Sequence, residues 1–175
     1  MPEQEAHTRF ESLLLPHLDA AYNLARWLMR NDQDAEDMVQ EAYLRAFKSF
    51  DNFYGVNARP WLLTIVRNTC YTLLAKNRTE GLAVSIEDEL VDLEGPGPDP
   101  ETFLLKRENK QLFKQVLEEL PLEFREALIL RELEELSYKE IAEIAGIPPG
   151  TVMSRLSRAR ARLKLLFLDR AKKEF

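Results

Sequence analysis

The sequence has 175 residues, of which 45% are hydrophobic, and its 30 acidic and 24 basic side chains give a formal net charge of −6. This length accommodates one domain or two small ones with modest hydrophobic cores. No apolar run approaches the roughly 18 residues of a membrane-spanning helix, and the N-terminus lacks the apolar stretch of a signal peptide. The single cysteine, Cys70, cannot form an internal disulfide, which favours a reducing compartment. We therefore expect a cytoplasmic, mostly helical protein without membrane insertion.

The net charge is unevenly distributed. Residues 79–101 contain eight acidic and no basic side chains, whereas residues 151–175 contain eight basic and two acidic ones, a local charge of +6. Residues 51–78 carry a local charge of +3. Two basic regions therefore flank an acidic segment, and this pattern indicates a polyanionic partner that the overall acidity conceals.

The first part of the chain predicts three helices. Apolar residues recur at steps of three and four over residues 9–30, with Pro16 predicting a kink or a helix start. A second helix begins with Asp32 or Asp34 as its cap and continues to about residue 50. After a loop, a third helix begins near Pro60, where an early position tolerates proline.

Residues 79–101 show no sustained periodicity and end in "GPGPDP", which favours an acidic flexible linker. Beyond it, residues 101–121 predict a helix that ends at Pro121, and three more helices follow. We expect an all-α fold of two small helical domains, over residues 1–78 and 102–175. The linker permits both compact and open arrangements of these domains.

The stretch "LSYKEIAEIAGIPPGTVMSRLSRAR" has the pattern of a helix-turn-helix. Ser137 and Glu140 have the spacing of a capping box, and Gly146 can adopt the left-handed conformation that ends a helix. Thr151 is placed to open or cap the next helix, whose arginines can reach phosphates or guanine edges. A basic helix alone would favour a solvated face, but the three features together favour DNA binding.

Three stretches together resemble the extracytoplasmic-function (ECF) sigma factors of the sigma-70 family, group IV. They are "DAEDMVQEAYLRAFKSFDNF", "RPWLLTIVRNTCYTLLAKNR" and "LPLEFREALILRELEELSYKEIAEIAGIPPGTVMSRLSRARARL". The resemblance assigns residues 1–78 to sigma region 2 and residues 102–175 to sigma region 4. It implies a transcription initiation factor that binds core RNA polymerase, directs it to promoters with −10 and −35 elements and assists DNA melting.

The resemblance also implies which residues contact each partner. The core-polymerase contacts would be Asp37, Gln40, Glu41 and Leu44. The −10 contacts would be Phe53, Tyr54, Trp61, Arg67, Asn68, Tyr71, Lys76 and Arg78, with Asn68 on a flipped base. The −35 contacts would be Thr151, Met153, Ser154, Arg155, Ser157, Arg158 and Arg162.

The residues support parts of this assignment without the resemblance. Asp37 and Glu41 lie four residues apart on one helix face, where like charges are unfavourable unless a basic partner meets them; a solvated acidic face is the simpler alternative. The −10 candidates include aromatic and basic side chains, which suit single-stranded DNA because bases stack on aromatic rings and phosphates pair with cations. Trp61 is the exception, since it fits a core position better. The linker resembles a segment that follows the polymerase's RNA path, and a solubilising spacer fits its residues equally well.

Three other functional classes are alternatives for this sequence. Catalysis is not expected, because the sequence has no Gly-rich phosphate loop, no metal-ligand cluster and only two histidines, and no cofactor or metal is predicted. A DNA-binding repressor would need a dimerising first half with a contiguous apolar patch. A protein-interaction adaptor held by an antagonist is the third alternative. It overlaps with the sigma-factor hypothesis, since sigma factors of this kind are commonly bound by an anti-sigma factor. We expect a monomer when the protein is free.

Overall fold

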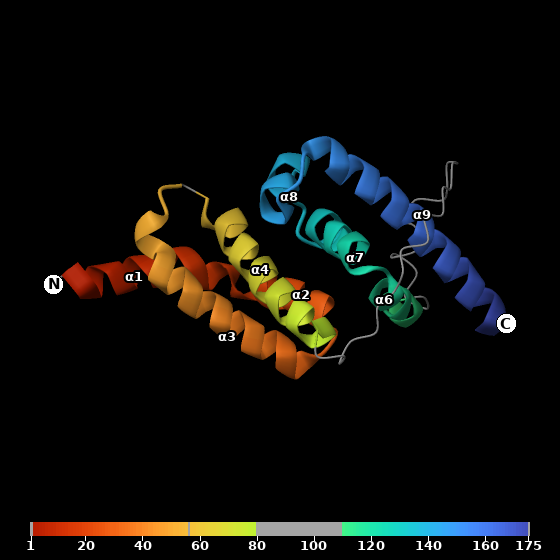
Figure 1. The fold of residues 1–175 in the computed structure, drawn as a ribbon, viewed down its shortest axis with the longest axis horizontal. Helices are drawn as coiled ribbons and strands as arrows, with labels where there is room; N and C mark the ends of the chain where they lie inside the picture. Colours follow the sequence, from red (N-terminus) through yellow and green to blue (C-terminus); the bar gives the residue numbers. More distant parts are fainter. Residues whose placement is uncertain (1, 56, 80–109, 175) are drawn as a thin grey trace.

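The computed structural model describes residues 2–55, 57–79 and 110–174, and every regular element in these ranges is a helix (Figure 1). The predicted acidic linker, apart from Thr79, lies outside the described residues, as does the beginning of the helix predicted from residue 101. The all-α fold expected from the sequence is confirmed.

The first group contains four α-helices and two 3-10 turns. They are α1 (Pro2–Leu14), η1 (Leu15–His17), α2 (Leu18–Met29), α3 (Asp32–Ser49), η2 (Phe50–Asn52) and α4 (Ala58–Thr79). The predicted kink at Pro16 is confirmed, because the chain passes through η1 there. The predicted cap of α3 is wrong. Asn31 caps this helix, since its extended backbone lets its side chain accept a hydrogen bond from the amide of Asp34 at 2.9 Å.

The second group contains a π-helical turn between α-helices. The elements are α6 (Lys110–Glu119), α7 (Leu122–Leu128), η4 (Ile129–Leu133), α8 (Tyr138–Ala145) and α9 (Pro149–Glu174). The capping box of α8 and the left-handed Gly146 that ends it are both present as predicted. Helix α9 begins at Pro149 rather than at Thr151, because a proline suits the first helical position, where its missing amide hydrogen costs no bond.

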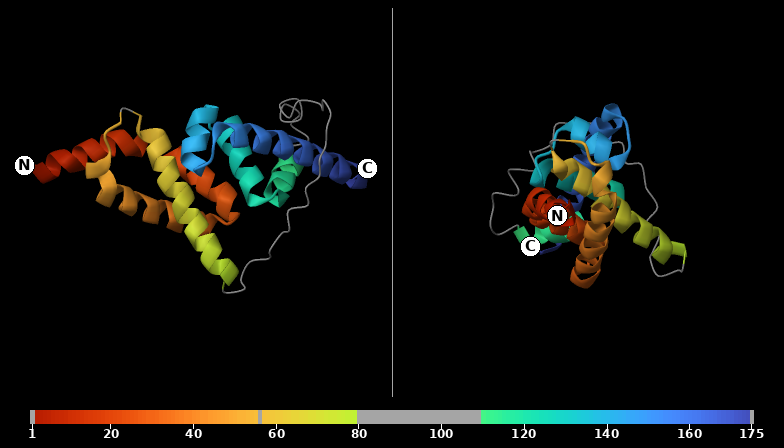
Figure 2. Two further views of the ribbon diagram at one scale, coloured as in Figure 1. Left: turned by 45° about the horizontal axis from the view of Figure 1, so that its top comes forward. Right: turned by 90° about the vertical axis from the view of Figure 1, so that its left-hand side faces the viewer.

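The two groups follow one another along the molecule, with the termini at opposite ends (Figure 1). Helices α2, α3 and α4 pack together in the first group, and α9 packs against α6, α7 and α8 in the second. Figure 2 shows the same arrangement from two other directions. The groups also touch each other, since α2 packs on α7 and η4, and α4 packs on α8.

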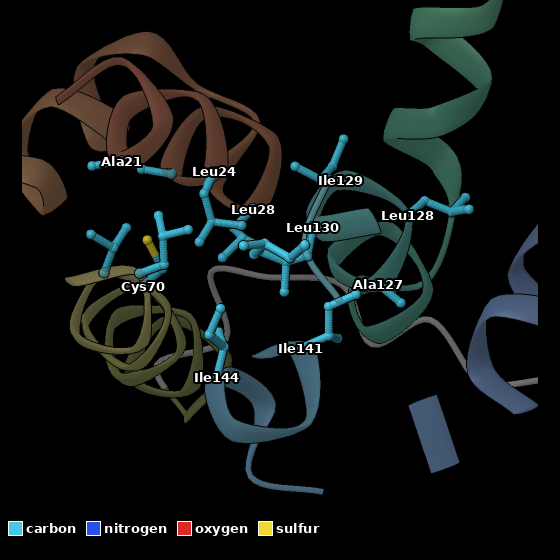
Figure 3. Close-up of a cluster of buried hydrophobic side chains, with 14 of the residues drawn as sticks. Ala21, Leu24, Leu28, Cys70, Ala127, Leu128, Ile129, Leu130, Ile141 and Ile144 are labelled. Atoms are coloured by element: carbon cyan, nitrogen blue, oxygen red, sulfur yellow. The ribbon is translucent and has the colours of Figure 1, made fainter. Parts of the chain in front are cut away.

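A single apolar cluster runs through both groups. Figure 3 shows Leu24 and Leu28 of α2 beside Ile129 and Leu130 of the second group, all of them almost completely buried. Burial of apolar surface is the main favourable term in folding and association. The contact between the groups is therefore a continuation of the core.

None of the helices within the described ranges combines the length and apolar character that crossing a bilayer requires.

Gly146 provides a test of the turn between α8 and α9. Its φ of 68° lies in the left-handed region, and a Cβ built there meets no atom within 4 Å. Gly146→Ala should therefore lower the free energy of unfolding by about 1 kcal/mol through backbone strain alone. Urea denaturation measures this change.

Gly150→Ala is the matched control. Gly150 lies in the first turn of α9 and its added Cβ would also meet nothing within 4 Å, but its φ is not positive. Alanine there should leave stability unchanged or raise it, because it removes the conformational freedom of glycine in the unfolded chain. Equal losses from both substitutions would contradict the assigned role of Gly146.

Candidate nucleic-acid and protein interfaces

The predicted polymerase contacts share one face of α3. Asp37, Gln40 and Leu44 are exposed, Leu44 to 58%, while Glu41 is half-buried and accepts a hydrogen bond from Arg45 Nε at 3.1 Å. Spacings of three and four residues place these side chains in a row. The opposite face carries the buried residues Ala35, Val39, Ala42 and Ala46. Helix α3 thus presents acidic groups on the turns that precede an exposed leucine.

An open groove of about 730 Å³ lies beside this face. Leu18 and Tyr22 of α2, Glu36 and Gln40 of α3, and Glu134 of the second group are among its lining residues. The groove is therefore shared by both halves of the chain and has an acidic character.

The predicted −10 aromatics lie in two different environments. Phe53 is only 7% exposed, and its ring centroid lies 6.2 Å from that of Phe50 and 5.0 Å from that of Trp61. Trp61 is half-buried in the same cluster, at the start of α4. Tyr54 is 90% exposed in the neighbouring loop. Phe53 and Trp61 thus support the loop, and Tyr54 is the aromatic side chain that this loop offers to a ligand.

In the middle of α4, Arg67 and Tyr71 are bound by a carboxylate from the second group. Arg67 Nε donates to Glu126 Oε1 at 2.8 Å, and the Tyr71 hydroxyl donates to Glu126 Oε2. The Arg67 guanidinium lies 3.7 Å from the centroid of the Tyr71 ring, a cation–π contact. Asn68, next to them, is exposed and accepts a hydrogen bond from Arg67 Nη1 at 3.3 Å.

Burial shapes the electrostatics around this carboxylate. Burial, followed by the nearby Glu126 carboxylate, raises the pKa of the Tyr71 hydroxyl. The same two causes, in the same order, raise the pKa of the Cys70 thiol to about 12. Both groups are therefore neutral at physiological pH, and Glu126 faces Arg67 as its charged partner.

The remaining predicted −10 residues lie at the end of α4. Lys76 and Arg78 are exposed in its last turns. They lie away from the aromatic cluster near Phe53, and because they are two residues apart they point to different sides of the helix. The structure thus distributes the predicted −10 residues along the whole length of α4 and the loop before it.

The predicted −35 residues surround the N-terminal half of α9. Met153, Ser154, Ser157 and Arg158 are exposed, whereas Thr151, Arg155 and Arg162 are half-buried. Arg155 Nη2 lies 3.6 Å from Glu123 Oε2 of α7. The buried stripe of the helix consists of Val152, Leu156, Ala159 and Leu163. Helix α9 therefore anchors itself through apolar side chains and leaves a small exposed face beside the turn.

Sequence reasoning missed the residues that join the halves. Glu126 and Glu134 are 1% and 8% exposed, and Glu134 Oε2 accepts from Arg59 Nη2 at 2.7 Å. Asn23 Nδ2 donates to Glu134 Oε1 at 3.0 Å. One available signal was the position of Glu126 on the apolar stripe of α7, four residues from Leu130. Among the described residues, no group of three or more histidine, cysteine or carboxylate side chains could hold a metal ion.

Two sigma-70 family models match the chain in order. The model of sigma-70 region 2 matches residues 13–80, and that of sigma-70 region 4 matches residues 110–163. Among curated proteins, the chain is 39% identical over 134 residues to the ECF RNA polymerase sigma-E factor of Escherichia coli, covering 73% of this chain and 70% of that protein.

This chain belongs to the ECF sigma factors of the sigma-70 family. It is also 34% identical over 163 residues to the ECF RNA polymerase sigma factor SigE of Mycolicibacterium smegmatis, covering 93% of this chain and 63% of that protein. Sigma factors are transcription initiation factors and not classical enzymes, so the chain is a promoter-directing initiation factor. The family assignment favours the polymerase-docking interpretation of the first half over the dimerising repressor.

Two solved structures have a similar fold. One is the sigma factor RpoE in complex with the anti-sigma factor NepR from Bartonella quintana, at a TM-score of 0.70 and 34% identity, covering 90% of this chain and 96% of that one. The other is CnrH in complex with the cytosolic domain of CnrY, at a TM-score of 0.65 and 25% identity, covering 95% and 94%.

The buried Cys70 thiol gives a test of the α4 environment. With a pKa of about 12 instead of 9.0, its thiolate fraction at pH 8 is about one in 10⁴ rather than about one in ten. Ellman's reagent attacks the thiolate, so it should react about a thousandfold more slowly with the native protein than with the protein denatured in urea. Because the chain has one cysteine, no other thiol contributes. Native and denatured rates within tenfold of each other would contradict the burial of Cys70.

Proposed function

We propose that the exposed face of α3 docks this sigma factor on core RNA polymerase while the exposed face of α9 reads the −35 element. One observation carries the proposal. The same chain presents an acidic face with an exposed leucine on α3 and, on a separate helix-turn-helix, an exposed face beside basic residues. These surfaces suit two different partners, a protein and duplex DNA.

The α3 face has the composition of a protein contact. Leu44 offers apolar area that water solvates poorly, and Asp37, Gln40 and Glu41 place charge and hydrogen-bonding groups on the two turns before it. An apolar centre with a polar rim is the usual arrangement of a protein interface. The acidic rim would meet a basic surface on the polymerase, and this complementarity would speed association.

The N-terminal half of α9 has the composition of a major-groove reader. Met153, Ser154, Ser157 and Arg158 would face base edges, where arginine pairs with guanine and serine accepts several bases. Thr151, Arg155 and Arg162 would lie nearer the phosphates, which fix the position of the helix on the duplex. The buried leucine stripe keeps this helix rigid during the contact.

Promoter melting would involve the loop before α4 and exposed residues of that helix. Tyr54 would stack on an unpaired base, and Asn68 would contact a flipped base through hydrogen bonds. Lys76 and Arg78 would hold the phosphates of the opened strand. Arg67 and Tyr71 would join this surface, with Phe53 and Trp61 supporting the loop.

The domain limits and partners belong to the same proposal. We assign residues 1–78 to the docking and −10 domain, residues 79–101 to the linker and residues 102–175 to the −35 domain. The protein would act in the cytoplasm as a monomer. It would be held by an anti-sigma factor, an assignment supported by the two similar structures, one of which contains a partner named as an anti-sigma factor.

Asp37→Arg tests the docking face. Reversing this exposed charge should abolish comigration with Escherichia coli core RNA polymerase in gel filtration, because an arginine would repel the basic surface that the aspartate meets. Glu11→Arg, an equivalent reversal at an exposed position of α1, should leave comigration intact. If both variants comigrate with the polymerase like the wild type, the α3 face is not the docking surface.

Arg158→Ala tests the reading of the −35 element. Holoenzymes containing the wild type or the variant would each select duplexes from a library with a randomised upstream element. The variant should lose discrimination at one position by about 1–3 kcal/mol, because a base contact disappears there. Lys172→Ala, an exposed position near the end of α9, should retain the wild-type preference. A uniform loss of affinity across all sequences would instead make Arg158 a phosphate contact.

A further inference from the structure

Arg160 of α9 continues the row of side chains that would read the −35 element. Met153 and Ser157, seven and three residues before it, are exposed, and these steps place the three side chains on one side of the helix. Arg160 lies about 4.5 Å further along the helix axis than Ser157. A recognition helix that enters the major groove by its N-terminal half brings its later turns close to the DNA backbone. An arginine at this place is therefore well placed to contact a phosphate.

Glu132 of η4 already binds this guanidinium. Arg160 Nε and Nη2 both donate to Glu132 Oε1, at 3.2 Å and 2.7 Å. Burial works against the charge of Arg160, but the hydrogen bond and the charge contact with Glu132 outweigh it and raise the pKa of the guanidinium. The Arg160 side chain is 36% exposed and the Glu132 side chain 22%. A phosphate would therefore compete with a carboxylate that is in place and partly shielded from solvent.

The backbone around Glu132 is fixed by its neighbours. The Leu136 amide donates to Leu130 O at 3.1 Å, which closes the chain between η4 and α8. Arg131 Nη1 donates to Leu136 O at 2.8 Å, and the Arg131 guanidinium lies 4.8 Å from the centroid of the Tyr138 ring, a cation–π contact. Glu132 thus projects its carboxylate toward α9 from a turn that these contacts hold in one conformation.

A second arginine of α9 is held much less firmly. Arg155 Nη2 lies 3.6 Å from Glu123 Oε2, which is beyond hydrogen-bonding distance, and the Glu123 side chain is 51% exposed. Exposed ion pairs of this kind contribute little free energy, so Arg155 can turn to a phosphate at small cost. Arg160 would have to leave a direct hydrogen bond to a carboxylate, which is roughly twice as strong as one between neutral groups. The two arginines therefore differ in their availability to DNA.

We infer that Glu132 withholds Arg160 from the DNA phosphates and thereby limits the sequence-independent affinity of α9 for duplex DNA. Glu132 is a positioning residue, since it acts through Arg160. The inference rests on the proposed −35 face of α9. Each phosphate that a cation neutralises adds affinity for every sequence alike. Because a genome offers a vast excess of competing sites, a factor with fewer such contacts loses less of its population to them.

Glu132→Gln tests the inference, because it removes the carboxylate charge and keeps the shape of the side chain. The full chain is titrated onto a fluorescein-labelled duplex of about 20 base pairs and mixed sequence, followed by anisotropy at several NaCl concentrations. The freed arginine should raise the affinity about tenfold at low salt. It should also steepen the slope of log K against log [NaCl] by about 0.9, the value for one additional phosphate contact.

Two further variants separate the role of Arg160 from a general change of charge. Glu119→Gln changes the net charge by the same amount, but its partner Arg170 lies near the far end of α9, so the slope should stay at the wild-type value. The double variant Glu132→Gln/Arg160→Ala should return to the wild-type slope, because it lacks the freed guanidinium. A slope that stays steep in the double variant, or that steepens equally in Glu119→Gln, overturns the inference.

An unchanged or shallower slope in Glu132→Gln also overturns the inference; a shallower slope would mean that the carboxylate holds Arg160 on a phosphate. Circular dichroism shows whether the variant keeps its helical content. If it does not, Glu132→Ser, whose side chain is too short to reach Arg160, decides the test by the same slope. Loss of helical signal in both variants overturns the inference as well, since the pair would then be a contact required for folding.

The −35 assignment of α9 is tested separately. Arg158→Ala is judged by sequence preference, which a phosphate contact does not change. An unchanged preference in that variant overturns the assignment of Arg158 to a base. The salt slope of Glu132→Gln decides the role of Glu132 whichever result Arg158→Ala gives.

Discussion

The packing of Leu24 and Leu28 against Ile129 and Leu130 is the contact on which the arrangement of the whole molecule depends (Figure 3). A helical domain of about 70 to 80 residues buries a smaller fraction of its surface than a large domain does, so apolar side chains of α2 gain stability by packing against a second domain. In this chain the partner is the other domain. The closed form is therefore stabilised by the same apolar burial that folds each half.

The polar contacts at this interface have a different effect. Buried ion pairs contribute little net stability, because desolvation of the two charges offsets their attraction, but removing one partner is costly. Glu126 and Glu134 thus add specificity to an otherwise apolar contact: they require arginines at two fixed places on α4. Arg125 works in the opposite direction, as a buried guanidinium bound to main-chain oxygens alone in the described contacts. The interface therefore combines apolar burial, which stabilises the contact, with ion pairs that fix which residues meet.

Local signals made much of the fold predictable from the sequence. The capping box at Ser137, the left-handed Gly146 and the break at Pro16 each act within a few residues, and each was confirmed. The cap of α3 and the first residue of α9 were wrong, since several neighbouring residues could fill either role and backbone conformation decided between them. The assignment of single residues to polymerase or DNA stays a prediction.

The contacts between the halves could not be predicted in this way. Arg67 and Glu126 are 59 residues apart, and neither belongs to a motif that names the other. The periodicity that places Glu126 on a buried stripe indicates that it needs a partner but not which one. The π-helical turn η4 likewise has no sequence signature here, although it positions Glu134. Long-range pairing of charged side chains is decided by packing, and packing was visible only in the structure.

The burial of Cys70 limits how this protein can react with oxidants. Peroxide and other oxidants attack thiolates that solvent can reach, and this thiol is completely buried with its pKa raised to about 12. Because it is the only cysteine of the chain, the folded protein has no readily oxidised thiol with which to register a change of redox state. A transcriptional response to oxidants through this factor would therefore have to use chemistry other than oxidation of this thiol.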